Sequence, residues 1–211
     1  MAERMARARE LRLVESPADD RIADVPRDEP LPSYAEVRSL QSADPDAIRA
    51  LYWQHHQALR ALGRHLLGSL DDAEDLLHEV FVAAPKALRK YRGDCSLRTF
   101  LSAIAVKRAG KMHRSWRRYR SALGALIRTG AERPVHHEHP EAALERSELS
   151  ALLAEELARL PFAQRAAVVL CLVEERPAAE AARILGIPEA TVRTRLFYGR
   201  RRLRKRLEGR P

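Results

Sequence analysis

Cysteine is scarce in this sequence, and aromatic residues and glycine are also few. The 211 residues include two cysteines, Cys95 and Cys171, which stand far apart in the chain. This spacing fits neither a metal site nor a disulfide framework, so we predict that each cysteine is a small buried apolar residue. Aromatic residues make up 5% of the chain and there are nine glycines, a composition that favours Leu- and Ala-rich helices over β-sheet.

Long hydrophobic runs are also missing. No segment approaches the roughly 18 apolar residues that a membrane-spanning helix requires. The opening MAERMARARELRLVES lacks the apolar stretch of a signal peptide. From these two absences we expect a soluble, cytoplasmic protein.

Acidic residues are outnumbered by basic ones. The chain has 38 Lys and Arg against 29 Asp and Glu, a formal net charge of +9 and a pI of about 10.1. Such an excess of positive charge suits a polyanionic partner, either a nucleic acid or an anionic membrane surface.

Sequence signatures of catalysis are absent. There is no glycine-rich phosphate loop, and the pair His78-Glu79 lacks the second histidine that a zinc-protease motif requires. The cluster HHEH, His136 to His139, has ligand character, but no cysteine or second spaced set completes a zinc site. We predict no metal, no cofactor, no small-molecule substrate and no enzymatic activity.

Prolines and apolar periodicity divide the chain into four parts. Residues 1–41 are predicted to be a disordered arm and residues 121–142 a flexible linker. Residues 42–120 form what we call the first helical block, and residues 143–209 the second helical block. The predicted fold class is therefore all-α, with two small helical domains joined by a linker.

Local signals place three helices in the first helical block. Asp44 and Pro45 begin the first helix, and Gly68 ends it. The second starts at Ser69 or Asp71 and runs to about Lys90, and Pro85 is expected to kink or break it. The third is capped by Ser96 and ends near Arg120.

The second helical block ends in a helix-turn-helix pattern. Residues 178–185 form a short helix, Gly186 allows a tight turn, and Pro188 starts a longer helix. The residues predicted to enter a DNA major groove are Glu189, Ala190, Thr191, Arg193, Thr194 and Arg195, and Arg193 and Arg195 are the best candidates for base contacts. Arg200 and Arg201 suit phosphates. The alternative is a solvated basic helix at the end of a small bundle.

The segment ILGIPEATVRTRLFYGRRRLRKRL resembles region 4 of bacterial sigma factors, and LPFAQRAAVVLCLVEERP resembles the lead-in to it. DAEDLLHEVFVAAPKAL and YRGDCSLRTFLSAIA resemble region 2 of the same family. The two matches occur in the family's order with no large domain between them, which is similar to the extracytoplasmic-function group. The resemblance implies binding to core RNA polymerase, to the −10 and −35 elements of promoter DNA, and to an anti-sigma factor.

An acidic run lies within the region 2 resemblance. Because region 2 of the family binds a coiled coil of RNA polymerase, the resemblance implies that Asp72, Glu74, Asp75 and Glu79 face polymerase. The alternative is compensation of the helix dipole, which accounts well for acids in the first turn but less well for Glu79.

The third helix is expected to hold a separated promoter strand. Its cations would contact phosphates and its aromatic residues would stack on bases, namely Lys107, Arg108, Lys111, Arg114, Trp116 and Tyr119. The resemblance places Asp94, Cys95 and Ser96 in a loop that captures a flipped base. The sequence departs from the family at Lys107 and Lys111, where many members have Asn and Asp, and at Pro85, where an aromatic residue is common. These departures put the recognised bases in doubt.

The chief rival hypothesis is a helix-turn-helix regulator that binds DNA without core polymerase. In that case the first helical block would serve as a dimerisation or sensor domain. An enzyme built on the histidine cluster is a distant third.

Overall fold

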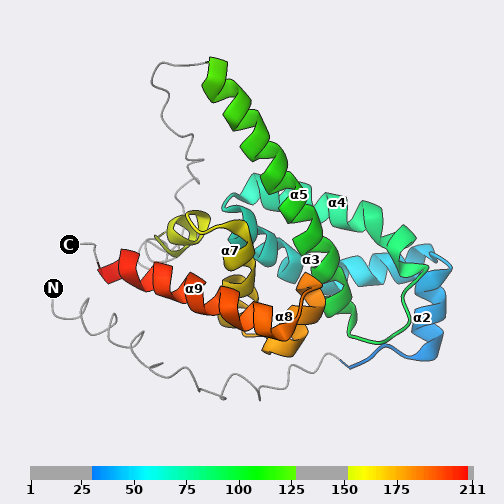
Figure 1. Cartoon of the computed structure of the whole chain (residues 1–211). Helices are drawn as coiled ribbons and strands as arrows, with labels where there is room; N and C mark the ends of the chain where they lie inside the picture. The colour runs from blue at the N-terminus through cyan, green and yellow to red at the C-terminus, as the bar shows by residue number, and fades with distance from the viewer. Residues whose placement is uncertain (1–29, 127–151, 209–211) are drawn as a thin grey trace, which may run out of the picture.

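The computed structural model describes residues 30–126 and 152–208, and every regular element within those ranges is a helix. The elements are α2 (Tyr34–Gln41), α3 (Pro45–Leu67), α4 (Leu70–Leu88), α5 (Leu97–Leu126), a helix over residues 152–158, α7 (Phe162–Val168), the π-helical turn η2 (Val169–Val173), α8 (Ala178–Leu185) and α9 (Glu189–Glu208). The all-α prediction is confirmed (Figure 1). Each described helix is too short or too polar to cross a membrane.

The predicted helix starts are confirmed at their capping side chains. The Asp44 carboxylate accepts a hydrogen bond from the Asp46 amide at 3.1 Å, and α3 begins at Pro45. Ser69 caps α4, and the Ser96 hydroxyl accepts from the Thr99 amide at 3.2 Å at the start of α5. Gly68 ends α3 with a left-handed φ of 85°. Short-range chemistry therefore sets these boundaries.

The predicted arm over residues 1–41 extends too far, because α2 lies within it. Val37 and Leu40 of α2 are buried, and the helix packs on α3 and α4. Ser33 caps α2 by accepting a hydrogen bond from the Glu36 amide. Residues 1–29 lie outside the described residues, so the rest of that prediction stays a prediction.

Two further boundaries differ from the prediction. Pro85 does not break α4, which continues to Leu88. Pro85 lies in the last turn, where a missing amide donor removes only one hydrogen bond near the helix end. The helix α5 passes Arg120 and reaches Leu126, inside the predicted linker, and the remainder of the linker lies outside the described residues.

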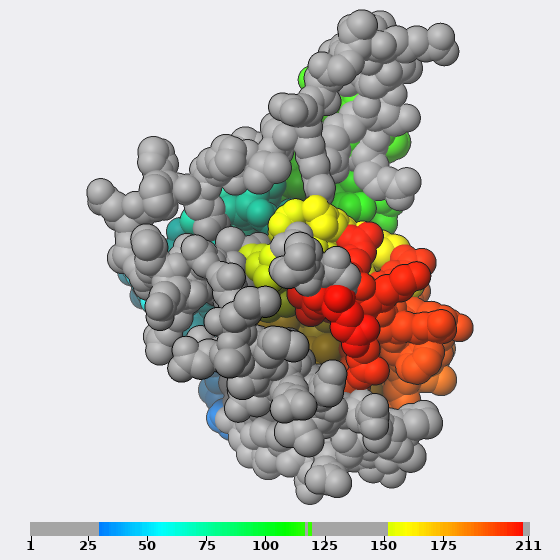
Figure 2. All heavy atoms as spheres, turned by 90° about the vertical axis from the view of Figure 1, so that its left-hand side faces the viewer, coloured from blue at the N-terminus to red at the C-terminus, as the bar shows by residue number. Residues whose placement is uncertain are grey.

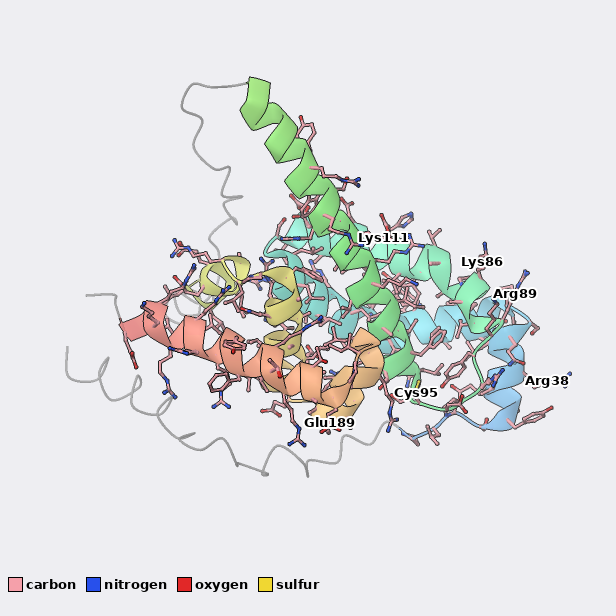
Figure 3. All side chains as sticks on the ribbon, viewed as in Figure 1. Arg38, Lys86, Arg89, Cys95, Lys111 and Glu189 are labelled. Atoms are coloured by element: carbon pink, nitrogen blue, oxygen red, sulfur yellow. The ribbon has the colours of Figure 1, made fainter. Side chains whose placement is uncertain are left out.

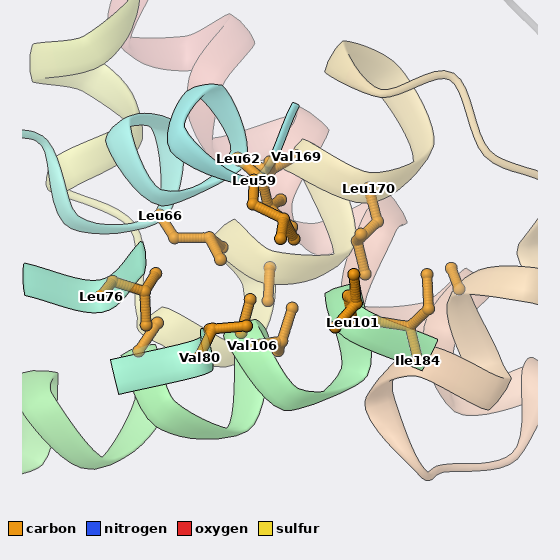
Figure 4. Close-up of a cluster of buried hydrophobic side chains, with 14 of the residues drawn as sticks. Leu59, Leu62, Leu66, Leu76, Val80, Leu101, Val106, Val169, Leu170 and Ile184 are labelled. Atoms are coloured by element: carbon orange, nitrogen blue, oxygen red, sulfur yellow. The ribbon is translucent and has the colours of Figure 1, made fainter. Parts of the chain in front are cut away.

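The buried side chains of both helical blocks form one contiguous cluster. Figure 4 shows Leu62 of α3 close to Val169 of η2, and Leu101 of α5 between Leu170 and Ile184. Within the second block, α9 packs against α7 and lies beside the helix over residues 152–158 (Figure 2). The two predicted domains therefore pack face to face and share their apolar core.

Candidate nucleic-acid interface

The helix-turn-helix is present with the boundaries that the sequence predicted. The helix α8 ends at Leu185, Gly186 has a φ of 64°, and α9 starts at Glu189. Nothing lies within 4 Å of a Cβ placed on Gly186, so glycine is needed there for its backbone angle and not for space. Ile184 of α8 and Val192 of α9 are buried in the shared core.

One side of α9 is exposed along most of its length. Its members are Ala190, Arg193, Thr194, Phe197, Tyr198 and Arg201, which recur at helical spacing. We call these residues the α9 stripe. The Arg193 guanidinium donates to the Glu189 carboxylate through Nε at 3.1 Å and Nη2 at 2.7 Å. The Thr194 hydroxyl donates to the Ala190 carbonyl at 2.9 Å, so its methyl group is left as the contact surface.

The structure separates the two arginines that the sequence analysis favoured as base contacts. Arg193 is exposed, whereas Arg195 is half-buried. Two residues along an α-helix correspond to a rotation of about 200°. The two side chains therefore cannot both contact bases at the floor of one major groove. Arg195, like Thr191 and Arg200, lies on a flank of the α9 stripe.

Sequence reasoning missed two aromatic residues in the α9 stripe. Phe197 and Tyr198 are 56% and 48% exposed, and their rings meet edge to face with centroids 5.4 Å apart. They follow Arg193 and Thr194 by four residues, so the helical spacing contained the signal. Large exposed aromatic residues on a cationic helix are typical of a binding surface.

The opposite side of α9 is fixed by close packing. Val192, Leu196, Gly199 and Leu203 form its buried side. A Cβ on Gly199 would lie 2.6 Å from Cγ2 of Val168 on α7, closer than real contacts allow. Glycine at position 199 therefore permits α9 to approach α7 closely.

Three of the four cations that were predicted to hold the strand fall on one face of α5, and Arg108 does not. Lys107, Lys111 and Arg114 are exposed at i, i+4 and i+7 spacing. Arg108 instead donates to the Glu79 carboxylate of α4 at 2.8 Å. Trp116 is half-buried and, nine residues after Lys107, lies about 180° around the helix. The structure thus groups three predicted strand contacts and places Arg108 and Trp116 elsewhere.

The predicted base-capture loop is anchored from both sides. Gln41 of α2 donates to the Tyr91 carbonyl at 2.7 Å, and the buried Tyr91 hydroxyl donates to the Cys95 carbonyl. The Tyr91 ring also packs on Phe100, with centroids 4.7 Å apart. Gly93 turns the chain with a φ of 80°. These contacts fix the backbone that presents Asp94, Cys95 and Ser96.

Cys95 lies at the start of α5, beside α8 (Figure 3). Partial burial raises the pKa of its thiol above the ordinary value, although the nearby Arg183 of α8 opposes this. Cys171 is 4% exposed, and burial raises its pKa to about 11. The prediction of a small buried residue is confirmed for Cys171, whereas Cys95 is only half-buried.

The acids of α4 have mixed surroundings. Glu74 forms an ion pair with Arg60 of α3, and Glu79 pairs with Arg108 of α5. Asp72 is half-buried at the helix start, whereas Asp75 is exposed. Val82, 67% exposed, follows Asp75 by seven residues and therefore lies on the same face of α4, so that face combines negative charge with an apolar side chain.

No group of histidine, cysteine or carboxylate side chains in the described residues is arranged to hold a metal ion. The predicted weak ligand cluster, His136 to His139, lies outside the described residues.

Comparison with known proteins gives consistent matches over both helical blocks. Residues 51–122 match the family described as Sigma-70 region 2, and residues 150–203 match Sigma-70, region 4. The ECF RNA polymerase sigma factor SigM of Mycobacterium tuberculosis is 30% identical over 83% of this chain and 85% of its own length. The RNA polymerase sigma-H factor of Pseudomonas aeruginosa is 29% identical over 82% of this chain and 92% of its own.

Two solved structures share the fold at 22% sequence identity. CnrH, in complex with the cytosolic domain of CnrY, has a TM-score of 0.61 over 84% of this chain and 97% of its own. The sigma factor RpoE in complex with the anti-sigma factor NepR, from Bartonella quintana, has a TM-score of 0.59 over 77% of this chain and 98% of its own. Below, residues 51–122 are called region 2 and residues 150–203 region 4.

Proposed function

Because this chain belongs to the extracytoplasmic-function group of sigma-70 RNA polymerase sigma factors, we propose that it binds core RNA polymerase through α4 and reads promoter DNA through α9 and α5. A sigma factor is an initiation factor and not itself a catalyst. The observation that carries the proposal is the presence, in one chain, of a helix-turn-helix with an exposed cationic stripe and a second cationic helix that begins at an anchored loop.

Region 4 is proposed to bind the −35 element as duplex DNA. Arg193 suits a guanine edge, and the Thr194 methyl and the Phe197 ring suit thymine methyl groups in the major groove. Arg201 continues the α9 stripe towards phosphates, and the half-buried Arg195 and Arg200 suit the sugar-phosphate rim of the groove. Glu189 competes for Arg193 through their ion pair, so base recognition requires this pair to rearrange or to act as one unit.

Region 2 is proposed to hold one strand of the −10 element. Lys107, Lys111 and Arg114 form a cationic row that matches a sugar-phosphate backbone, and the loop at Asp94 to Ser96 is placed to receive an extruded base. Extruding a base costs about a few kcal/mol. A loop whose backbone is already fixed loses less conformational entropy when it binds that base.

The face of α4 that carries Asp75 and Val82 is proposed to bind core RNA polymerase. Negative charge beside an exposed apolar side chain suits a basic helical partner. Glu79 lies next to this face, but its ion pair with Arg108 at 2.8 Å makes it a weaker candidate than Asp75.

An anti-sigma factor is a further proposed partner. The RpoE structure is that of a complex with an anti-sigma factor, and CnrH was solved with the cytosolic domain of CnrY. Because core RNA polymerase is the proposed target, we infer that the chain works in the cytoplasm.

The decisive experiment is in vitro transcription with core polymerase and purified chain, followed by mapping of start sites on genomic DNA. Initiation that depends on the chain supports the proposal. Duplex binding without any initiation would instead support the rival regulator. Asp75→Lys should lower the affinity for core polymerase about tenfold or more, as expected when a charge at an interface is reversed. The matched control Asp46→Lys reverses an exposed acid at the start of α3 and should bind as the wild type does.

A further inference from the structure

Regions 2 and 4 are joined by polar contacts between the start of α5 and the segment that runs from η2 to α8. Arg98 of α5 donates to the Glu174 carboxylate at 2.9 Å, and the Thr99 hydroxyl donates to Glu180 at 2.6 Å. Arg176 donates to the hydroxyls of Thr99 at 3.4 Å and Ser102 at 3.3 Å. We call these six residues the interdomain latch: Arg98, Thr99, Ser102, Glu174, Arg176 and Glu180.

Three members of the interdomain latch are buried, whereas the Arg98 side chain is 39% exposed. Arg176 is 4% exposed, Thr99 5% and Ser102 1%. A second buried arginine, Arg165 of α7, donates to the carbonyl of Leu66 at the end of α3 at 2.7 Å. Charged hydrogen bonds of this kind stabilise an interface more than neutral ones do.

Both arginines also have partners inside region 4. Arg176 pairs with Glu180 one turn along the same segment, and Arg165 donates to the carbonyls of Ala158 and Leu160. If the regions separated, neither guanidinium would be left buried without an acceptor, which is the usual penalty for breaking a buried charge pair. The polar contacts therefore open without leaving either arginine unpaired, and the main cost of separation is exposure of the apolar core that the two regions share.

This closed arrangement conflicts with the proposed function, on which the present inference rests. The −10 and −35 elements are named for their distances from the start site, so they lie roughly 25 base pairs apart, about 85 Å at about 3.4 Å per base pair. A compact chain of this length has a radius of gyration of about 17 Å. Region 2 and region 4 cannot occupy both elements while α5 and α8 are in contact.

The chain between the regions is long enough for them to separate. Residues 127–151, stretched at about 3.4 Å per residue, reach about 85 Å. In the closed structure region 4 also lies next to the predicted base-capture loop of region 2, because α8 packs on the start of α5 beside Cys95.

We propose that the closed structure is an inactive state in which region 4 packs against the start of α5, at the edge of the base-capture loop of region 2, and that the interdomain latch holds it shut. Promoter binding then requires the latch to open. The structure assigns this control to contacts within one chain, so it operates in the absence of any anti-sigma factor.

The two native cysteines provide the test. Cys95 lies half-buried at the edge of the interface, so the rate at which a maleimide modifies it reports opening. Cys171 is buried in η2 and should react more slowly, and circular dichroism of each variant shows that it stays folded. Arg98→Glu and Glu174→Arg each place like charges together, and each should raise the Cys95 rate about three- to tenfold. The double variant, Arg98→Glu with Glu174→Arg, restores an ion pair and should return the rate to within about twofold of the wild type.

The control Arg49→Glu reverses an exposed charge on α3. Arg49 pairs with Asp46, three residues earlier on the same helix, so the Cys95 rate should stay unchanged. Equal Cys95 rates in the wild type and both single variants overturn the proposal, and so does a double variant that stays as reactive as the single ones.

A milder variant covers the case in which charge reversal also exposes Cys171. Ser102→Ala removes one hydroxyl acceptor of Arg176 and should raise the Cys95 rate about twofold while Cys171 stays protected. The same variant should bind a single-stranded −10 oligonucleotide about twofold more tightly without polymerase. No change in either measurement overturns the proposal.

The labelling experiment uses neither polymerase nor DNA. If the labelling experiment fails, the latch proposal is refuted and the proposed role in initiation is unaffected. If the wild type does not support initiation, the proposed function itself is refuted.

Discussion

The two long cationic helices, α5 and α9, are held in opposite ways. The helix α9 buries one side from Val192 to Leu203 and exposes the α9 stripe opposite. The helix α5 has buried residues only up to Gly110. After Gly110, none of its residues with described side chains is buried, and the end of the helix projects from the molecule (Figure 1). A stiff duplex is read by a helix that is rigid along its length, whereas a flexible single strand can be gathered by cations on a projecting arm.

The same contrast holds for the ion pairs of the two helices. Arg193 of α9 pairs with Glu189 on its own helix, four residues away. Arg108 of α5 pairs with Glu79 of α4, and Arg98 pairs with Glu174 of region 4. Arg206 of α9 also reaches Glu156 at 3.6 Å, so the ion pairs of α9 stay within region 4, whereas one of those of α5 crosses from region 2 to region 4. Substitutions in α9 should therefore affect region 4 alone, whereas substitutions in α5 should also affect the contact with region 4.

The largest effect is expected from Gly199→Ala. The added Cβ would overlap Cγ2 of Val168, so we expect a loss of about 1–3 kcal/mol of unfolding free energy, as for other overpacked cores. Thermal and urea unfolding measure this loss. The matched control is Gly110→Ala on α5, where the new Cβ would lie 3.2 Å from the Phe162 ring edge, which can shift. Equal losses in the two variants would refute the claim that α9 is the more tightly fixed helix.

Arg193→Ala should weaken recognition at one position of the −35 element by about 1–3 kcal/mol, because one base-edge contact is lost. The measurement is holoenzyme binding to promoters that carry single base changes. Lys111→Ala on α5 is the comparison: it should leave −35 specificity intact and reduce the slope of log affinity against log salt by about 0.7, as for one single-strand phosphate. A uniform loss across all −35 variants would show that Arg193 contacts only phosphate.

The helix-turn-helix was predictable because its signals are local. Gly186 sets the turn, Pro188 sets the start of α9, and the predicted boundaries match the structure. The α9 stripe was predicted only in part, since Phe197 and Tyr198 were passed over although they share the spacing of Arg193. Arg195 was predicted to act with Arg193, but helix geometry puts the two on different sides.

Contacts between distant residues were not predictable from one sequence. The helix α2 forms because Val37 and Leu40 bury themselves on α3 and α4, and the one local signal for it, Ser33 followed by Glu36 three residues later, was passed over. The Glu79–Arg108 pair joins residues to which the sequence analysis gave opposite partners. Arg176 looks like an ordinary polar loop residue until Thr99 and Ser102 are placed beside it.

Tyr91→Phe tests whether the loop before α5 needs its anchor. The variant loses only the hydroxyl that donates to the Cys95 carbonyl, one hydrogen bond worth about 0.5–1.5 kcal/mol. We expect strand separation at the −10 element to fall roughly two- to tenfold, while core binding and −35 recognition stay at wild-type levels. Fluorescence of 2-aminopurine in the −10 element measures strand separation. Tyr34→Phe removes an exposed hydroxyl from α2 and serves as the control. Unchanged melting in Tyr91→Phe would mean that the loop does not need this contact.

The smallest effect concerns pH and His65, in the last turn of α3. Burial lowers its pKa below the model-peptide value of 6.5, with Glu174 of region 4 opposing the shift and Arg64 adding to it. As the pH falls through that ordinary value, the unfolded chain takes up a proton that the folded chain resists, so stability falls until the pH passes the folded-state pKa. Unfolding of the wild type and of His65→Gln at about pH 7.5 and about pH 5.5 should therefore show a larger acid loss in the wild type. Because the negative charge of Glu174 raises the pKa of His65, Glu174→Gln should lower this pKa further and enlarge that loss. Equal acid losses in all three proteins would mean that His65 of α3 and Glu174 of region 4 are not electrostatically coupled at this contact.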